Sequence, residues 1–258
     1  MERDPCFAHL YSDPKAKLAT AEDLIASMDR EGIDLSIVLN IGWASHQMCV
    51  ETNDYIMEAV SRYPRCLVGF CSLQPKAGEA AIAELERCAR GGIRGIGEMR
   101  PDIQGFDLGD ETAMRPVVEA AANHHFILLI HSSEPVGHLY SGKGNITPDI
   151  LYRFICQFPQ ISIVLAHWGG GLPLYALMPE VSQALANVFF DTAATPFLYQ
   201  PQIFSHVGQI VGFDKILFGS DYPLLSPSRI ISQLRSVGLG VEVEGLILGG
   251  NAERLLGL

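Results

Sequence analysis

Three apolar, strand-like runs end in polar side chains that could bind a metal. The run FILLIH ends at His131, ISIVLAH ends at His167, and KILFGSD ends at Asp221. Imidazole nitrogen and carboxylate oxygen are ligands that zinc and similar divalent ions prefer, and a catalytic metal site keeps one position open for water. Such an ion lowers the pKa of its bound water, so that a neighbouring base can accept the proton. The three residues therefore predict a site for metal-assisted chemistry.

Each of these residues also has a purely structural interpretation, in which it satisfies a backbone group at a strand end. For a single histidine that interpretation is favoured, but three residues at one edge of a sheet favour the metal site. Glu98, in GIGEMRP, is a further carboxylate at a strand end, and for this residue a role as metal ligand or substrate contact and a purely structural role are equally favoured. We expect Asp191 to anchor the turn after its strand.

Two residues near these strand ends are candidate substrate contacts. Trp168 follows His167, and it either lines the pocket or packs outside it; His138 lies in the loop after the FILLIH run. The glycines at 169–171 fit a tight turn in which the backbone passes close to a ligand, although an ordinary loop explains them as well. We predict Trp168 and His138 as substrate-binding residues.

Short β-branched runs and helical patterns alternate along the whole chain. Apolar strands that are separated by one helix each indicate a parallel sheet covered on both faces. No long linker interrupts the alternation, so we expect one domain over residues 1–258, with 1–19 as a loop or lid. The strand-like runs begin at Ile33, Cys66, Ile93, Phe126, Ile161, Val188 and Lys215, and the helical patterns cover 20–31, 53–63, 78–92, 111–125 and 147–158.

An open doubly wound sheet and a (β/α)8 barrel share this alternation. In an open sheet of seven strands, the outermost strands lie roughly 29 Å apart, so polar residues at five strand ends would not converge. In a barrel the same ends surround one mouth, where barrel enzymes place their chemistry. We therefore predict an α/β fold of the (β/α)8 TIM-barrel type.

Composition excludes several classes of function. The chain has 258 residues, a formal net charge of -11 and no basic cluster, which excludes a nucleic-acid surface. Its six cysteines form no C-x-x-C pair, which is typical of reduced packing cysteines rather than of disulfides or a cysteine zinc site. Neither a signal-peptide pattern nor a membrane-spanning run is present. We expect a cytoplasmic protein with a small-molecule substrate, and a homodimer is the commonest assembly for such chains.

Several motifs resemble the amidohydrolase superfamily. AHWGGGLPLY (166–175), LFGSDYP (217–223) and GGNAERLLGL (249–258) resemble its amidohydrolase-related branch, which includes aminocarboxymuconate semialdehyde and resorcylate decarboxylases. LLIHSSEP (128–135) falls where that branch places its strand-five histidine. The resemblance implies that His131 is a metal ligand and His167 a substrate-facing acid or base. It also implies that Asp221 is a ligand or the base for metal-bound water, and that the ion is Zn²⁺.

The branch includes C–N and ester hydrolases as well as non-oxidative decarboxylases. We expect a metal-dependent hydrolase that acts on a small, cyclic or carboxylated substrate through a metal-activated water. A non-oxidative decarboxylase is the alternative from the same branch. A truncated, non-catalytic remnant with a weak metal site is the alternative from another class.

The N-terminus departs from the family pattern. Members normally open with a strand that ends in His-x-His and supplies two metal ligands, whereas the only histidine before the first predicted helix is His9. That helix also precedes the first strand, which leaves seven strands where a barrel needs eight. We therefore expect an absent first strand, an open slot between the runs at 33–40 and 215–220, and a partial metal site of His131, Asp221 and Glu98.

Overall fold

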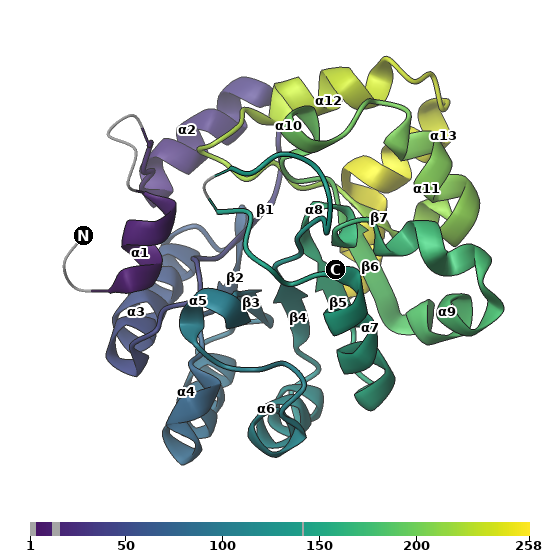
Figure 1. Cartoon of the computed structure of the whole chain (residues 1–258). Coiled ribbons are helices and arrows are strands. Elements are labelled where there is room, and N and C mark those ends of the chain that lie inside the picture. The colour runs from purple at the N-terminus through teal and green to yellow at the C-terminus, as the bar shows by residue number, and fades with distance from the viewer. Residues whose placement is uncertain (1–3, 12–15, 141) are drawn as a thin grey trace.

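Seven parallel strands form one sheet in chain order, and each strand pairs with the next along the sequence (Figure 1). The computed structural model describes residues 4–11, 16–140 and 142–258. Every strand lies within one of the predicted runs, which confirms the seven-stranded, barrel-type prediction. The strands are β1 (Ser36–Val38), β2 (Leu67–Cys71), β3 (Gly95–Met99), β4 (Ile127–Ile130), β5 (Ile163–Leu165), β6 (Val188–Asp191) and β7 (Ile216–Leu217).

Helices surround the outer face of the sheet (Figure 1). The long ones are α2 (Ala21–Glu31), α3 (His46–Arg62), α4 (Glu79–Arg90), α6 (Glu111–Asn123), α7 (Pro148–Gln157), α11 (Ile203–Val211) and α12 (Pro227–Arg235). The short ones are α1 (Pro5–Leu10), α5 (Pro101–Gln104), α8 (Ala166–Gly169), α9 (Pro179–Ala184), α10 (Thr195–Leu198), α13 (Val241–Gly245) and α14 (Asn251–Leu256). Single turns of 3-10 helix cover Pro75–Ala77, Leu185–Asn187 and Phe213–Lys215, a longer one covers Leu172–Leu177, and Leu246–Gly250 is π-helical.

Local sequence explains where the first long helix begins and ends. The side chain of Thr20 accepts a hydrogen bond from Asp23 N, and the Asp23 carboxylate accepts one from Thr20 N, so that α2 begins with a capping box. The helix ends at Gly32, whose left-handed backbone (φ 69°) suits a residue without a side chain. The helix lies within the pattern predicted over 20–31.

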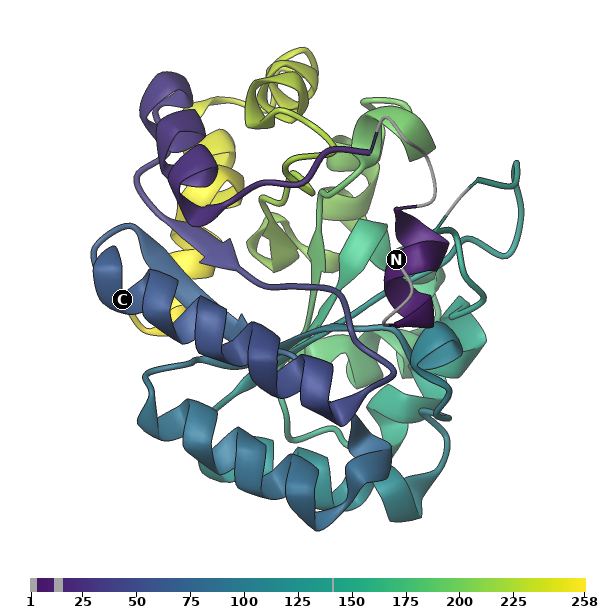
Figure 2. The ribbon, with the colours of Figure 1, turned by 90° about the vertical axis from the view of Figure 1, so that its left-hand side faces the viewer.

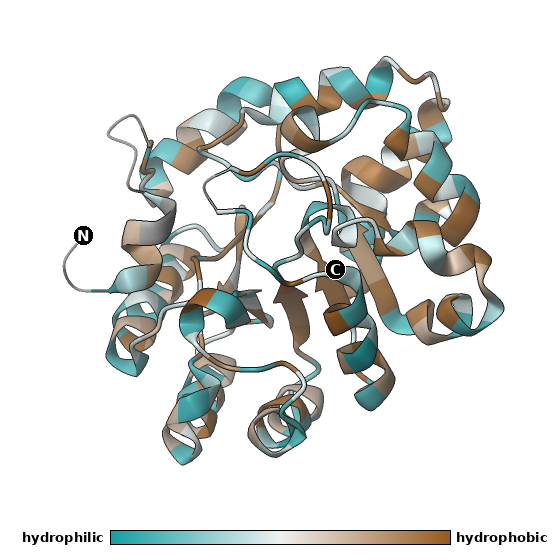
Figure 3. Cartoon of the chain, viewed as in Figure 1, coloured by the Kyte–Doolittle hydropathy of each residue, from teal (hydrophilic) through white to brown (hydrophobic). Residues whose placement is uncertain are grey.

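Side chains on the strands alternate between two apolar clusters. Leu128 and Ile130 of β4 belong to the large core between the sheet and its helices. Ile127 and Val164 belong to a smaller cluster inside the curl of the sheet, which Leu256 of α14 also joins. The apolar colour of the central strands in Figure 3 reflects burial on both faces. This double burial is typical of a parallel barrel sheet.

The sheet curls into a half-barrel that does not close. Among the described residues no pairing joins β7 back to β1. A cavity of about 1930 Å³ extends from the mouth into this opening, and Ile37 and Leu39 line it from one edge while Leu217 and Phe218 line it from the other. The cavity occupies the position of the predicted slot.

The N-terminal segment is partly helical, so the prediction of a loop over residues 1–19 is wrong for residues 5–10. Asp4 accepts a hydrogen bond from Cys6 N, and Pro5 occupies the first turn, which together start α1. The helix packs against α5, where the Cys6 thiol donates to Ile103 O (3.3 Å; Figure 2). Residues 1–3 and 12–15, and the side chain of His9, lie outside the described part of the chain.

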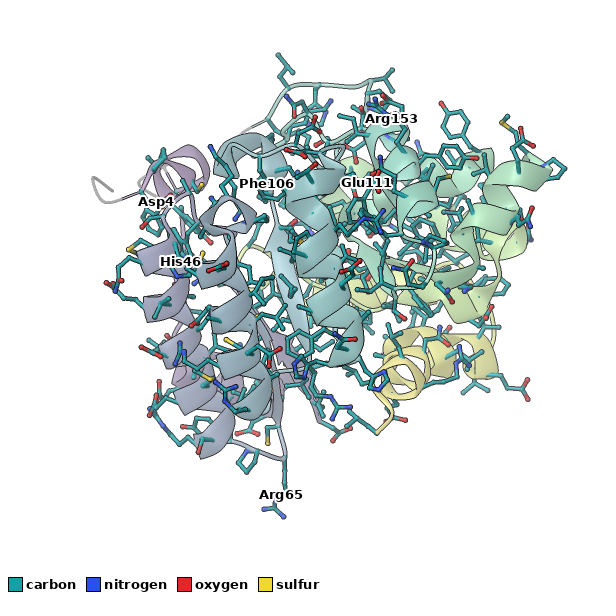
Figure 4. The ribbon with its side chains drawn as sticks, turned by 90° about the horizontal axis from the view of Figure 1, so that it is seen from below. Asp4, His46, Arg65, Phe106, Glu111 and Arg153 are labelled. Atoms are coloured by element: carbon teal, nitrogen blue, oxygen red, sulfur yellow. The ribbon has the colours of Figure 1, made fainter. Side chains whose placement is uncertain are left out.

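Asp4 ties this segment to the next helix. Its carboxylate also accepts a hydrogen bond from Ser45 N (3.0 Å), the N-cap residue of α3, and Figure 4 shows Asp4 near His46 at that end of the helix. Phe7 and Tyr11 line the cavity. The segment therefore lies at the mouth, as predicted, although as a helix.

Two further features agree with the sequence. All six cysteines are free thiols. Within the described residues, no helix is both long and apolar enough to cross a membrane.

Two matched substitutions test whether the barrel is open beside β1. Ile163→Ala, in the packed outer core, should lower the free energy of unfolding by about 2–5 kcal/mol, because it leaves a cavity among close neighbours. Ile37→Ala should cost about 1 kcal/mol, because that side chain already faces open space. Urea unfolding of both variants measures the difference. Equal losses would mean that another part of the chain covers β1.

Candidate metal centre

Glu98, His131 and His167 converge at the carboxyl ends of three neighbouring strands. Glu98 lies in β3, His131 follows β4, and His167 follows β5. The Nδ1 atom of His131 lies 2.8 Å from Glu98 Oε1, and the Nε2 atom of His167 lies 3.6 Å from the same oxygen. One ligand atom from each residue lies within 4.8 Å of the others. The adjacency of β3, β4 and β5 in the sheet produces this cluster.

A backbone carbonyl fixes the tautomer of His131. Its Nε2 atom lies 3.0 Å from Lys143 O. A carbonyl only accepts hydrogen bonds, so Nε2 carries a hydrogen and donates it, and Nδ1 is the ring atom that faces Glu98. The ammonium of Lys143 donates to Val136 O (2.8 Å) and His138 O (3.1 Å), which holds this loop in place.

His167 is oriented in the same way by the loop after β6. Its Nδ1 atom lies 3.3 Å from Ala193 O and therefore donates, which leaves Nε2 as the ring atom that faces Glu98. The Asp191 carboxylate accepts hydrogen bonds from His167 N (2.9 Å) and Ala193 N (3.0 Å). Asp191 thus anchors the strand-end turn, as predicted, and stabilises the left-handed backbone of His167 (φ 55°).

The donor set fits a divalent cation. Histidines that bind metals usually donate their other ring N–H to a carbonyl or carboxylate, and both histidines here do so. Nδ1 of His131, Nε2 of His167 and the Glu98 carboxylate face a common point. Once deprotonated, the two ring nitrogens would each offer a lone pair, and this is a set that zinc, manganese and similar ions accept. The site can therefore hold a metal through Glu98, His131 and His167.

The closeness of these side chains shifts the pKa of Glu98 and that of His167. Burial alone would lower the pKa of His167, but its hydrogen bond to Glu98 and the charges of Asp221, Glu98 and Asp191 raise that pKa to about 10. Burial opposes ionisation of Glu98, yet the two histidines hold the pKa of its carboxyl well below its usual range. Without a metal, Glu98 is an ionised carboxylate beside the protonated imidazole of His167.

Asp221 lies at the same mouth but outside this cluster. It follows β7 with a left-handed backbone (φ 62°), its carbonyl accepts a hydrogen bond from Leu224 N, and its exposed side chain lines the cavity. The structure thus brings together two of the three predicted ligands, His131 and Glu98. It adds His167, which its strand-end position offered as a ligand but to which the resemblance assigned an acid or base role.

The two predicted substrate contacts have different positions. His138 lines the cavity from an exposed loop. Trp168 is fully buried, donates from Nε1 to Thr195 Oγ1 (2.9 Å) and packs edge-on against Phe204, and it is not among the residues that line the cavity. The structure therefore does not bring Trp168 to the substrate space.

The glycine turn approaches protein rather than ligand. A side chain at Gly170 would lie 2.4 Å from Ser133 O, in the loop that follows β4. Its positive φ (59°) is also one that favours glycine. The close backbone approach that we expected there is made to this loop.

Sequence reasoning missed three contributors. The carbonyl oxygens of Lys143 and Ala193 carry no signal in residue type, because every residue has one. Arg100 was visible, since it stands two residues after Glu98 in GIGEMRP. Its side chain is only 2% exposed and lines the cavity beside the cluster.

Comparison with known proteins identifies the family. Residues 6–258 match the family described as Amidohydrolase. The chain belongs to the amidohydrolase family. This confirms the resemblance seen in the motifs around His131, His167 and Asp221.

Two curated relatives of this amidohydrolase are decarboxylases. A 2-amino-3-carboxymuconate-6-semialdehyde decarboxylase from Dictyostelium discoideum is 23% identical over 91% of this chain and 76% of its own length. A gamma-resorcylate decarboxylase from a Polaromonas species is 21% identical over 96% of this chain and 91% of its own length.

A solved structure has the same fold. It is 5-carboxyvanillate decarboxylase from Novosphingobium aromaticivorans, in complex with manganese and 4-hydroxy-3-methoxy-5-nitrobenzoic acid. The two structures align with a TM-score of 0.81 at 21% identity, over 99% of this chain and 88% of the other. The ion in that protein is manganese, whereas we expected zinc.

The amidohydrolase should lose metal affinity when either predicted ligand is replaced. Glu98→Gln and His131→Gln should each weaken Mn²⁺ and Zn²⁺ binding by at least about 100-fold, because each removes a donor that the neighbouring loop holds in place. Isothermal titration calorimetry of both ions measures this. His138→Gln, in the exposed loop, is the control and should bind as the unsubstituted chain does. Unchanged binding in the Glu98 variant would contradict the assignment.

Proposed function

We propose that this amidohydrolase is a metal-dependent, non-oxidative decarboxylase of a small, cyclic carboxylate. The observation that carries the proposal is the cluster of Glu98, His131 and His167 beside Asp221, all of which line one cavity at the carboxyl ends of the strands. The two decarboxylase relatives favour this reaction over the hydrolysis that we placed first from the sequence.

Decarboxylation needs a proton for the carbon that loses carbon dioxide. A divalent ion held by Glu98, His131 and His167 would supply positive charge to hold oxygen atoms of the substrate. We assign the proton transfer to Asp221, whose side chain is exposed in the cavity. Its carboxyl donates a proton to the substrate carbon, the electrons of the breaking C–C bond stay with that carbon, and carbon dioxide leaves. Solvent then returns a proton to Asp221.

His167 has a second task in this scheme. Its Nε2 atom faces Glu98, and its Nδ1–H is held by Ala193 O, so its ring cannot turn freely. A fixed imidazole keeps the Glu98 carboxylate in one position. We therefore propose His167 as a metal ligand and positioning residue, in place of a free acid or base.

Hydrolysis remains the second candidate. The same donor set lowers the pKa of a bound water, and Asp221 could accept its proton. A reaction that yields an alcohol or amine without carbon dioxide would favour this candidate.

The proposed reaction is tested with gamma-resorcylate and 5-carboxyvanillate in the presence of Mn²⁺ or Zn²⁺. We expect release of ¹³C-labelled carbon dioxide from the carboxyl-labelled compounds, and its loss when EDTA removes the metal. Asp221→Asn should lower kcat by roughly 10²–10⁴-fold while metal content stays unchanged, because it removes the proton donor. Asp214→Asn, on the exposed surface, is the matched control. Full turnover in the Asp221 variant would contradict its role.

The open slot gives a separate prediction about metal affinity. Three protein donors and an open barrel edge should bind metal weakly, since the family pattern adds two histidines from a first strand. Fusing an extended strand with a His-x-His end before residue 1 should raise Mn²⁺ affinity at least about tenfold and should raise turnover at limiting metal. The same strand with Gln-x-Gln is the control. Tight metal binding and ordinary turnover in the 258-residue chain would show that residues we assigned elsewhere complete the site.

A further inference from the structure

Two side chains that line the cavity each carry a buried hydrogen-bond donor that stays unpaired within the described residues. The donors are Arg100 Nε and Trp43 Nε1, and neither has a partner among the described residues. Both side chains line the cavity that contains the metal cluster. Buried donors without partners are rare because each costs free energy, so two beside one cavity indicate that a ligand completes them.

Arg100 is a buried cation with unused donors. Its side chain is 2% exposed, and its Nη2 atom donates to Gly142 O (2.7 Å). Asp102 Oδ2 lies 3.9 Å from Nη2, which is within ion-pair distance but too far for a hydrogen bond, and Nε has no hydrogen-bond partner among the described residues. A guanidinium presents parallel N–H groups that match the two oxygens of a carboxylate. The chemistry at this point therefore favours an anion with two oxygens.

Trp43 adds a donor and an aromatic face. Its ring is 6% exposed and lies nearly parallel to Phe7, with centroids 6.1 Å apart and an interplanar angle of 14°. Phe7 in turn stacks on Tyr11 at 4.7 Å. All three rings line the cavity. Stacked rings at the edge of a cavity favour a flat ligand over a branched one.

The backbones of Arg100 and Trp43 are held together by buried amides. Gln104 accepts a hydrogen bond from Arg100 N (2.8 Å) and donates to Trp43 O (3.1 Å). Gln74 also donates to Trp43 O (3.2 Å) and to Gln104 O (3.1 Å). The two donors thus stand on one rigid support, which suits a preformed binding site.

We propose that Arg100 and Trp43 form a carboxylate subsite that selects planar, ring-bound carboxylates. Arg100 pairs with the carboxylate through Nε, and Trp43 donates to an oxygen of the same ligand while the aromatic stack borders its ring. The subsite rests on the proposed function only for its part in substrate choice, because binding requires neither turnover nor metal.

The test compares benzoate with benzamide, which has the same shape without the charge. Calorimetry is done on the full chain with EDTA present, so that no metal contributes. We expect benzoate to bind at least about tenfold more tightly than benzamide. Arg100→Gln should remove that preference, and Arg153→Gln, an exposed arginine of α7, should keep it. The same preference in the Arg100 variant, or no detectable binding of benzoate by the unsubstituted chain, would overturn the proposal.

A second variant keeps the test informative if Arg100→Gln does not fold. Trp43→Phe replaces the indole by a smaller aromatic ring without an N–H. Benzoate affinity should therefore fall roughly fivefold with an unchanged circular dichroism spectrum. Unchanged affinity in a folded Trp43 variant would count against the subsite. Benzoate preference without carbon dioxide release from gamma-resorcylate would contradict the proposed function and support the subsite. Carbon dioxide release without any benzoate preference would contradict the subsite and support the proposed function.

Discussion

The Glu98 carboxylate lies between two imidazole nitrogens, Nδ1 of His131 and Nε2 of His167. The loops at the mouth of the barrel hold both rings in these positions. Each histidine has donated its other N–H to a carbonyl, of Lys143 in one case and of Ala193 in the other. Those carbonyls belong to loops that buried contacts hold, through the Lys143 ammonium and the Asp191 carboxylate. A shift of either loop would free one histidine ring and move its nitrogen away from Glu98. The three side chains would then no longer bind one cation together.

Much of this arrangement was visible in the sequence, because the carboxyl ends of parallel strands must meet at one edge. Strand runs that end at His131 and His167, with Glu98 one strand earlier, therefore placed these three side chains at one edge, whereas the predicted ligand Asp221 lies outside their cluster. The position of Asp191 also followed from its place at a strand end. What could not be predicted is which ring nitrogen faces the cluster, since this depends on backbone carbonyls whose positions arise only in the folded loops.

Other errors have equally specific causes. Trp168 neighbours His167 in sequence, but the left-handed backbone at both residues sends the indole to Thr195 and Phe204 instead of to the cavity. Residues 5–10 were expected to be a loop because six residues give too little periodicity to reveal a helix. The capping pair Asp4 and Pro5 was the available signal. Arg100 was not predicted as part of the site, because a guanidinium is not a metal ligand.

Within the described residues no further strand pairs with the outer edges of β1 and β7, and this bears on how the chain behaves among its own copies. A strand edge with free N–H and C=O groups is a template for another strand, whether that strand belongs to the same molecule or to a neighbour. Short edges limit this tendency, and β7 has only two residues and β1 only three. Apolar side chains beside the opening increase it. At β7 the chain already occupies two of these groups, because Ile216 O accepts a hydrogen bond from Asn251 Nδ2 (2.8 Å) and Phe218 N donates one to Ile247 O (3.0 Å). The edge that links the concentration of the chain to its state of association is therefore that of β1.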